Sequence, residues 1–187
     1  PLYSSAASDV YKRQGKILSS SGNISITASA SSTRGMSLGE VSAPSGQITI
    51  SSPSTSAVTL NSAIISGGSF SLTTGATLFT TQAANSISTT SGNVSLTANT
   101  MTLGGSINAS SGTVTIVPNT ADRDINVVEA TRVTGTLSVT ATELERISAT
   151  TLRLTNSGLG DIKFETNLDL ALTCLLYTSP SPRDRTN

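Results

Sequence analysis

The chain has 187 residues, of which 36% are hydrophobic, only 3% aromatic and only 12% charged, and the charged share is about half that of an ordinary globular domain. The formal net charge is zero, so we predict no nucleic-acid partner, because binding phosphates requires an excess of basic side chains. No apolar run approaches the roughly 20 residues that a membrane-spanning helix needs, and we predict no membrane span.

The two ends of the chain differ in character from the rest. Residues 4–14 (SSAASDVYKRQ) and 174–184 (CLLYTSPSPRD) resemble in-frame translations of the two adapters of a transposase-type sequencing library. We therefore predict that residues 1–14 and 174–187 are non-native, adapter-derived tails, and that residues 15–173 are the biological segment. We expect any export signal to lie outside this sequence.

Cysteine and histidine are missing from the predicted biological segment. The single cysteine, Cys174, lies in a predicted tail, and the chain contains no histidine. This composition is compatible with secretion, and it removes disulfides, Cys/His zinc sites and thiol catalysis from consideration for residues 15–173.

A short repeated phrase runs along the chain from residue 22 onward. It consists of glycine, a small or polar residue, an apolar residue, a fourth residue that is usually Ser or Thr, and a second apolar residue. Its copies begin 20 to 25 residues apart. They are residues 22–26 (GNISI), 46–50 (GQITI), 68–72 (GSFSL), 92–96 (GNVSL), 112–116 (GTVTI) and, more loosely, 135–139 (GTLSV) and 160–164 (GDIKF).

Each phrase predicts a short strand with one buried face, preceded by a turn in which glycine permits a positive φ. Second strands are predicted about half a period later, at residues 58–60, 77–79 and 100–103. The predicted inward pairs are Ile24 and Ile26, Ile48 and Ile50, Phe70 and Leu72, Val94 and Leu96, and Val114 and Ile116.

Stacked coils bury the apolar face that a lone strand leaves exposed. We therefore predict an all-β fold, a right-handed single-stranded parallel β-helix (β-solenoid) with about seven coils of 20–25 residues. An antiparallel β-sandwich is the structural alternative, since Ser/Thr-rich strands at regular spacing suit it as well.

The repeats resemble those of the filamentous haemagglutinin-like exoproteins, the large adhesins exported by two-partner secretion. The likeness covers most of residues 15–173 and is closest at residues 89–118 and 137–156, although autotransporter passengers use similar phrases. The resemblance implies a rigid stalk, secreted to the surface of a Gram-negative bacterium. It also implies an outer-membrane secretion partner for the full-length protein, with receptors or glycans on host or neighbouring cells as ligands.

Charged residues are distributed unevenly along the chain. Between residues 17 and 121 only Arg34 and Glu40 are ionisable. Two clusters follow: Asp122, Arg123 and Asp124 in the first, and Asp161, Lys163 and Glu165 in the second. Paired carboxylates support acid/base chemistry in some enzymes, but we favour a polar turn for the first cluster and a solvated face or cross-rung salt bridge for the second.

Three smaller patterns have both functional and structural interpretations. Residues 158–161 (GLGD) resemble one piece of a glycine-rich calcium repeat, but a single copy carries little weight. The spacing of Thr142 and Glu145 predicts a capping box on a short helix, with Leu144 and Ile147 facing inward. A receptor-binding protrusion is the functional alternative for that helix. Asn23 and Asn93 follow turn glycines, and we expect them to stabilise turns rather than to bind a ligand.

From these patterns we predict a structural and adhesive repeat segment of a large secreted bacterial surface protein. The sequence predicts no enzyme activity, no cofactor, and no catalytic, cofactor-binding or metal-ligating residue. The alternative is a fragment of a carbohydrate-active β-helix enzyme of the polysaccharide lyase or glycosidase type. Convergence of Asp122, Asp124, Asp161 and Glu165 in one cleft would favour that alternative.

Overall fold

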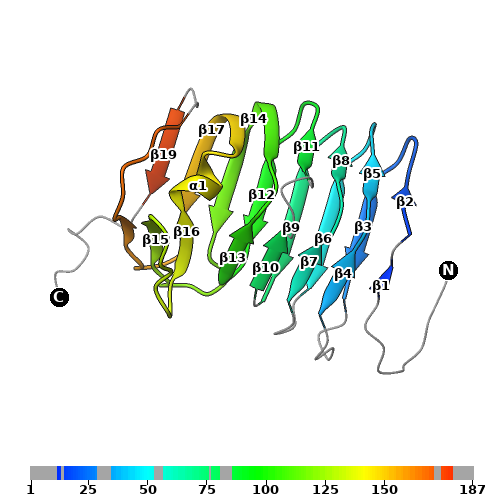
Figure 1. Ribbon diagram of the computed structural model, residues 1–187. Helices are drawn as coiled ribbons and strands as arrows, with labels where there is room; N and C mark the ends of the chain where they lie inside the picture. Colours follow the sequence, from blue (N-terminus) through cyan, green and yellow to red (C-terminus); the bar gives the residue numbers. More distant parts are fainter. Residues whose placement is uncertain are drawn as a thin grey trace.

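The computed structural model describes residues 12–13, 15–28, 35–52, 57–75, 77–80, 86–170 and 174–178. Within these ranges the chain forms a parallel β-solenoid of about six turns (Figure 1). Every strand pair of the described chain is parallel. The prediction of a parallel β-helix is therefore confirmed, and the β-sandwich alternative is wrong.

Each regular turn of the chain contributes to three faces. The first face is a five-stranded sheet of β1 (Lys12–Arg13), β4 (Met36–Leu38), β7 (Val58–Leu60), β10 (Thr77–Thr80) and β13 (Thr100–Leu103). It contains the predicted second strands. The other two faces are the arms of one bent eleven-stranded sheet.

The second face consists of β2 (Ile17–Leu18), β5 (Val41–Ala43), β8 (Ile64–Ser66) and β11 (Ile87–Thr89). The third face consists of β3 (Ile24–Thr27), β6 (Ile48–Ser52), β9 (Phe70–Thr74), β12 (Val94–Thr97) and β19 (Cys174–Thr178). Two longer strands, β14 (Ile107–Val117) and β17 (Ile147–Thr155), bend from the second face into the third, with a register shift between Ala109 and Thr113. The second-face strands were not predicted, because two or three residues are too few to show a period.

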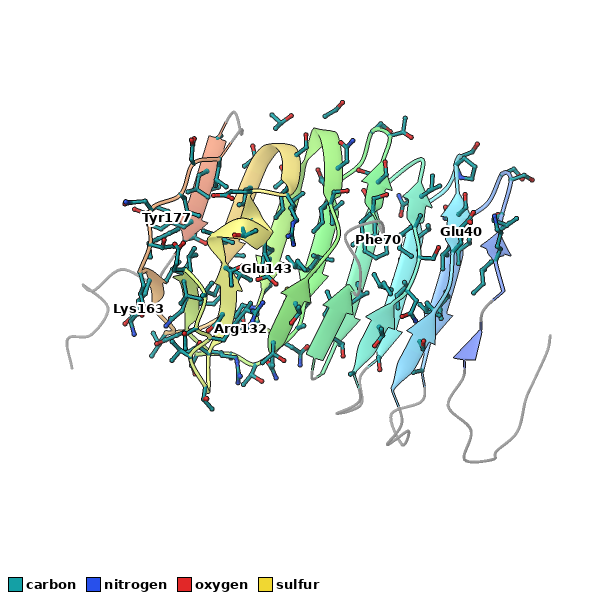
Figure 2. All side chains as sticks on the ribbon, viewed as in Figure 1. Glu40, Phe70, Arg132, Glu143, Lys163 and Tyr177 are labelled. Atoms are coloured by element: carbon teal, nitrogen blue, oxygen red, sulfur yellow. The ribbon has the colours of Figure 1, made fainter. Side chains whose placement is uncertain are left out.

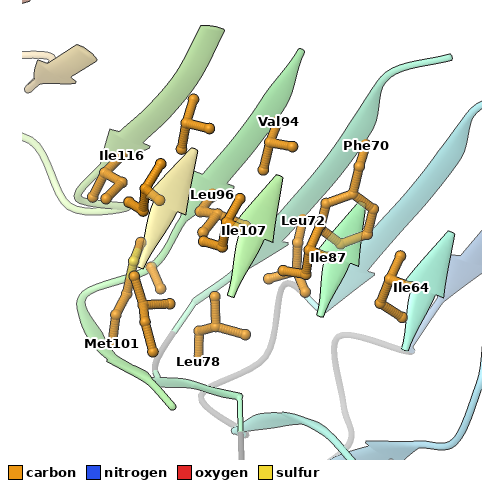
Figure 3. Packing of buried hydrophobic residues seen from close by; sticks show 14 of the residues in the cluster. Ile64, Phe70, Leu72, Leu78, Ile87, Val94, Leu96, Met101, Ile107 and Ile116 are labelled. Atoms are coloured by element: carbon orange, nitrogen blue, oxygen red, sulfur yellow. The ribbon is translucent and has the colours of Figure 1, made fainter. Parts of the chain in front are cut away.

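The interior is built from equivalent apolar side chains stacked in register. On the third face the predicted inward positions, joined by Leu152 and Leu154 of β17, form two columns that pass through consecutive strands. They are Ile24, Ile48, Phe70, Val94, Val114 and Leu152 in one column, and Ile26, Ile50, Leu72, Leu96, Ile116 and Leu154 in the other. Nearly all of these side chains are buried in a single core (Figure 3), so each rung supplies the cover that its neighbours need.

The turn glycines are required for a different reason from the predicted one. Gly135 is the only glycine with a positive φ among the described residues, so the glycines of the five regular phrases do not serve a left-handed turn. Instead, a Cβ added to Gly46 or Gly92 would lie well inside van der Waals contact of the backbone of the preceding turn glycine. At Gly46, Gly92 and Gly112, close stacking of the turns leaves room for glycine alone.

The two loose phrases occupy a different place in the solenoid from the five regular ones. Residues 135–139 and 160–164 supply β16 (Leu137–Thr140) and β18 (Ile162–Phe164), which join β15 (Ile125–Val128) in a separate sheet of order β16–β15–β18. The column that starts at Ile24 instead passes from Val114 to Leu152 of β17. The prediction of about seven coils therefore becomes about six.

Chain order and spatial order differ in this last sheet. β16 lies beside β13, and β15 lies beyond β16, although β15 comes first in the chain (Figure 1). After β14 the chain thus leaves the place next to β13 empty and forms β15 one place further along. It then returns through residues 129–136 and places β16 between β13 and β15. We call the segment 125–146 the reversed rung.

The strands β1 and β19 lie in the segments predicted to be adapter-derived. β1 pairs with β4, and β19 pairs in register with β17. All five residues of β19 are exposed. Pairing does not test where these residues come from, so the origin of the tails stays a prediction; residues 1–11 and 179–187 lie outside the described residues.

Candidate functional site

The two predicted clusters of charge meet on the outside of the reversed rung. Asp124 directly precedes β15, and Asp161 directly precedes β18. These strands are hydrogen-bonded neighbours with Ile125 opposite Ile162, so the carboxylates of the two clusters lie on adjacent rungs. We call Asp122, Asp124, Asp161, Lys163 and Glu165 the acidic ladder.

Lys163, near the C-terminal end of the solenoid (Figure 2), contacts two carboxylates of the acidic ladder. Its Nζ lies 2.9 Å from Asp124 Oδ2 and 4.0 Å from Asp161 Oδ2. The other oxygen of Asp124, Oδ1, accepts a hydrogen bond of 2.8 Å from the backbone N–H of Asp161. The predicted cross-rung salt bridge is therefore present, and Asp124 is engaged through both oxygens.

Asp122 closes a turn between the same two rungs. Its backbone has φ of 61°, a conformation that Asp tolerates better than most non-glycine residues. Its Oδ1 accepts a hydrogen bond of 2.5 Å from the N–H of Leu159. A Cβ on Gly158 would overlap the Asp122 side chain, so glycine at the bend of residues 157–159 lets the two rungs approach closely.

The electrostatics of the acidic ladder follow from these contacts. The hydrogen bond from Lys163 lowers the pKa of Asp124, and the bond from the Asp161 backbone lowers it further. The same hydrogen bond raises the pKa of Lys163. Both shifts favour the charged forms, so the Asp124–Lys163 pair is ionised near neutral pH.

The acidic ladder has the chemistry of a surface salt-bridge network. Its side chains point outward, and about half of Asp161 and of Lys163 is exposed. Among the described residues no group of three or more Asp, Glu, Cys or His is placed to hold a metal ion. The four acidic residues that sequence analysis named for the enzyme alternative thus lie on neighbouring rungs, but on an exposed face.

A second polar site, buried inside the reversed rung, was not predicted. The Glu143 carboxylate is almost fully buried, and its Oε1 lies 2.5 Å from Arg132 Nη2. The same Oε1 accepts a hydrogen bond of 2.7 Å from the N–H of Leu103, the last residue of β13. Arg146 Nη1 donates to the carbonyl of Leu103 at 3.3 Å. β13 pairs with β10 on one side only. The side chains of Glu143 and Arg146 thus bond the N–H and C=O groups of Leu103, the last residue of this edge strand.

The short helix α1 (Ala141–Leu144) positions Glu143. Thr140 is the N-cap, its hydroxyl accepts from the Glu143 N–H, and Glu143 Oε2 accepts from the Thr140 N–H at 2.8 Å. The predicted capping pair, Thr142 with Glu145, is wrong by two residues. Both spacings fit the sequence, but only this one directs Glu143 toward β13. Leu144 and Ile147 are buried as predicted.

The asparagines that follow turn glycines link consecutive turns. Asn23 Oδ1 accepts from the Gln47 N–H at 2.8 Å, and Asn93 Oδ1 accepts from the Thr113 N–H at 2.8 Å. Asn99 makes the same kind of bond to the Thr120 N–H. The prediction that Asn23 and Asn93 stabilise turns is confirmed.

Comparison of this chain with protein-family models, with curated proteins and with solved structures found no match. Within the described part of the chain, no helix is long and apolar enough to cross a membrane. What the fold itself defines is a class, the parallel β-solenoids, built from a stacked repeat.

Proposed function

We propose that this chain is a structural and adhesive repeat segment of a large secreted bacterial surface protein of the filamentous haemagglutinin-like type. The observation that carries the proposal is the uninterrupted apolar column from Ile24 to Leu152, which passes through six strands in register. A continuous core with interchangeable rungs suits a stalk, because length is gained by adding repeats without redesigning the interior.

The outer surface of the regular rungs suits a stalk as well. Outward positions of the third face are Ser and Thr in strand after strand: Ser25 and Thr27, Thr49 and Ser51, Ser71 and Thr73, and Ser95 and Thr97. With a strand separation of about 4.8 Å, six rungs form a rod roughly 25–30 Å long. A rod with a neutral hydroxyl surface has no feature that concentrates binding energy at one point.

We place the adhesive determinant on the reversed rung. This segment interrupts the repeat with a loop (residues 129–136), with helix α1, and with five charged side chains, whereas residues 41–121 have none. Val133, in the loop, is an exposed apolar residue. Loops carried on a rigid scaffold are the usual place for binding residues.

Cell adhesion tests this proposal. Beads coated with the full chain are expected to bind cultured epithelial cells or a glycan array above the level of uncoated beads. Val133→Asp is expected to reduce binding, whereas Ile65→Asp in the middle of the second face leaves it unchanged. The two side chains are a matched pair, since both are 39% exposed. Absence of binding by the parent chain contradicts an adhesive role for this segment.

A carbohydrate-active enzyme fragment is the second candidate, favoured by one observation: the acidic ladder brings Asp124 and Asp161 together on neighbouring strands. Under this candidate the full chain depolymerises an acidic or neutral polysaccharide, and Asp161→Asn abolishes the cleavage. Lack of product from a panel of polysaccharides, measured by size-exclusion chromatography, counts against it.

The predicted tails and the export route are tested together by the gene. Recovery of the uninterrupted coding sequence is expected to replace residues 1–14 and 174–187 with further repeats, and to show an export domain upstream. A gene that encodes the two tails in the same reading frame contradicts the adapter-derived origin.

A further inference from the structure

The segment between β15 and β16 has to turn back along the strands that it connects. These two strands are hydrogen-bonded neighbours that run parallel, so residues 129–136 must return along their length before β16 can begin. The inward side of both strands is filled by core residues, namely Ile125, Val127, Leu137 and Val139. The return therefore runs over the outward side, and we call residues 129–136 the strap.

Two polar side chains are buried on that outward side. Asn126 of β15 and Ser138 of β16 lie opposite each other in register, and each is only 3% exposed. Outward positions of the regular rungs, such as Ser71 and Ser95, keep more of their surface exposed. The Val133 N–H donates to Ser138 Oγ at 2.9 Å, so the strap lies directly on this surface and covers it.

The strap itself contributes little to the core. All residues from 129 to 135 are exposed, so the strap is held down by hydrogen bonds rather than by buried apolar side chains. One of these bonds runs from Arg123 Nη2 to the carbonyl of Thr136, at 3.4 Å. A segment with few buried apolar contacts opens locally while the rest of the protein stays folded.

Arg132 makes the strongest attachment of the strap. Its Nη2 lies 2.5 Å from Oε1 of the buried Glu143 carboxylate, and its Nη1 donates to the carbonyl of Ser138. The same Glu143 oxygen accepts from the Leu103 N–H at 2.7 Å. One guanidinium thus ties the strap to β16 and, through Glu143, to β13, and hydrogen bonds between charged groups are stronger than neutral ones.

Other features of the closed strap favour its opening. Asn126 Oδ1 and Arg123 Nε are buried without a hydrogen-bond partner in the described part of the chain, and opening lets water satisfy them. Gly135, near the C-terminal end of the strap, has φ of 85°, a conformation that glycine adopts without steric cost. A small residue at the end of a moving segment suits a hinge.

We propose that the strap is a lid that opens and closes over the outward face of β15 and β16 while the solenoid stays folded, and that the Arg132–Glu143 ion pair is its latch. The closed state presents the strap to solvent, whereas the open state presents Asn126 and Ser138. The reversed rung therefore has two surfaces that a ligand can distinguish. The proposal rests on the fold and is independent of the adhesive role.

Thiol labelling of the full chain tests the lid. In a Cys174→Ser background, which removes the single native cysteine, Ser138→Cys places a thiol beneath the strap. Val139→Cys is its matched control, because Val139 is the next residue of the same strand but points into the core and is 0% exposed. Under native conditions we expect a maleimide dye to label Ser138→Cys much faster than Val139→Cys, since unfolding of the rung is needed to expose position 139.

The latch is tested by Arg132→Gln, with a substitution of the exposed Arg153 of β17, Arg153→Gln, as its control. We expect Arg132→Gln to accelerate labelling of Ser138→Cys about tenfold or more, because a hydrogen bond between charged groups is lost. Labelling of Val139→Cys should not change, and Arg153→Gln should change neither rate.

Equal labelling rates of the two cysteines would show that the strap does not open by itself. Unchanged labelling of Ser138→Cys in the Arg132→Gln background, or equal acceleration at both positions, would overturn the latch.

Hydrogen exchange without any cysteine substitution covers the case in which a cysteine variant does not fold. In Arg132→Gln the amides of Val133 and Thr136, which are bonded within the strap or to Ser138, should exchange faster than in the parent chain. The amides of Ile125 and Leu137, which begin β15 and β16, should keep their exchange rates. A uniform change at all four amides, or no change at any of them, contradicts the proposal.

Discussion

The regular rungs (residues 36–117) and the part of the chain that follows them (residues 118–170) satisfy the hydrogen-bonding groups of their strand edges in different ways. In the regular rungs each strand edge is completed by the next turn of backbone, and charged side chains are almost missing. In the second part the strand order is reversed, and the side chains of Glu143 and Arg146 complete the edge of β13.

This difference teaches why the charges lie where they do. A backbone ladder satisfies N–H and C=O groups without help wherever the repeat continues, so Ser, Thr and Ala suffice outside the core. Where the repeat is interrupted, a buried N–H such as that of Leu103 needs another acceptor, because an unpaired buried polar group costs about 1–3 kcal/mol. Glu143 supplies that acceptor, and Arg132 balances its charge.

The largest expected effect concerns the column of the regular rungs. Leu96 is fully buried, and Leu96→Ala is expected to lower the free energy of unfolding by about 2–5 kcal/mol through lost burial and a cavity. Chemical denaturation measures it. Ser95→Ala, outward on the same strand, should change stability by less than about 0.5 kcal/mol; equal losses for the two would contradict the inward assignment of Leu96.

A somewhat smaller effect is expected at the stacked turns. Gly92→Ala forces a Cβ against the backbone of the Gly68 turn, and we expect a loss of about 2–3 kcal/mol from overpacking. Gly22→Ala occurs in the same phrase, but its Cβ would meet only the Ser19 hydroxyl at 3.4 Å, an ordinary contact. Similar thermal stability of the two variants would argue against close stacking as the reason for glycine.

In the reversed rung, we expect the free energy of unfolding to depend on one carboxylate, that of Glu143. Glu143→Gln leaves the Leu103 N–H with a weaker acceptor and Arg132 without a counter-charge, and we expect a loss of about 1–2 kcal/mol. The exposed Glu145 serves as the control through Glu145→Gln. Hydrogen exchange should locate the loss of protection at β13 and β16, whereas uniform loosening of all rungs would be inconsistent with a local role.

The smallest expected effect is the pH response of the acidic ladder. The pKa of Asp124 is lowered from its ordinary 3.8, so its contribution is present above that pH and is lost as the pH falls through the lower, folded-state value. The pKa of Lys163 is raised from 10.5, so its contribution is lost as the pH rises above that value.

Lys163→Met tests this response. The variant should show a weaker fall in melting temperature than the parent chain, both below pH 3.8 and above pH 10.5. High salt should reduce the difference at neutral pH, because the pair is exposed and is screened by ions. Identical pH profiles for the two proteins would show that the pair contributes nothing to stability.

Local sequence predicted the regular rungs well, because each phrase states its own strand and its own buried face. Ile24, Ile48, Val94 and Val114 were all assigned inward from alternation alone, and the structure stacks them in one column. The same reasoning failed for residues 135–139 and 160–164. Their phrases predict strands correctly, but a five-residue pattern carries no information about which face of the coil the strand joins.

The candidate sites likewise include one feature that the local pattern predicts and others that it does not. The pairing of Lys163 with a carboxylate of another rung was foreseeable, since alternation places Asp161, Lys163 and Glu165 outward. The partner, Asp124, and the burial of Glu143 beneath β13 depend on contacts across 39 and 40 residues of sequence. Such contacts follow from the return of the chain at residues 129–136, which no local pattern records.

The period of apolar and small residues by itself determined that this chain coils into parallel rungs around a common interior, because only stacking buries strands so short. The order of β15 and β16, the number of turns and the choice of Thr140 over Thr142 as helix cap were decided by tertiary structure. In each case two arrangements satisfy the local pattern equally, and only the long-range demand to pair strand edges and bury side chains distinguishes them.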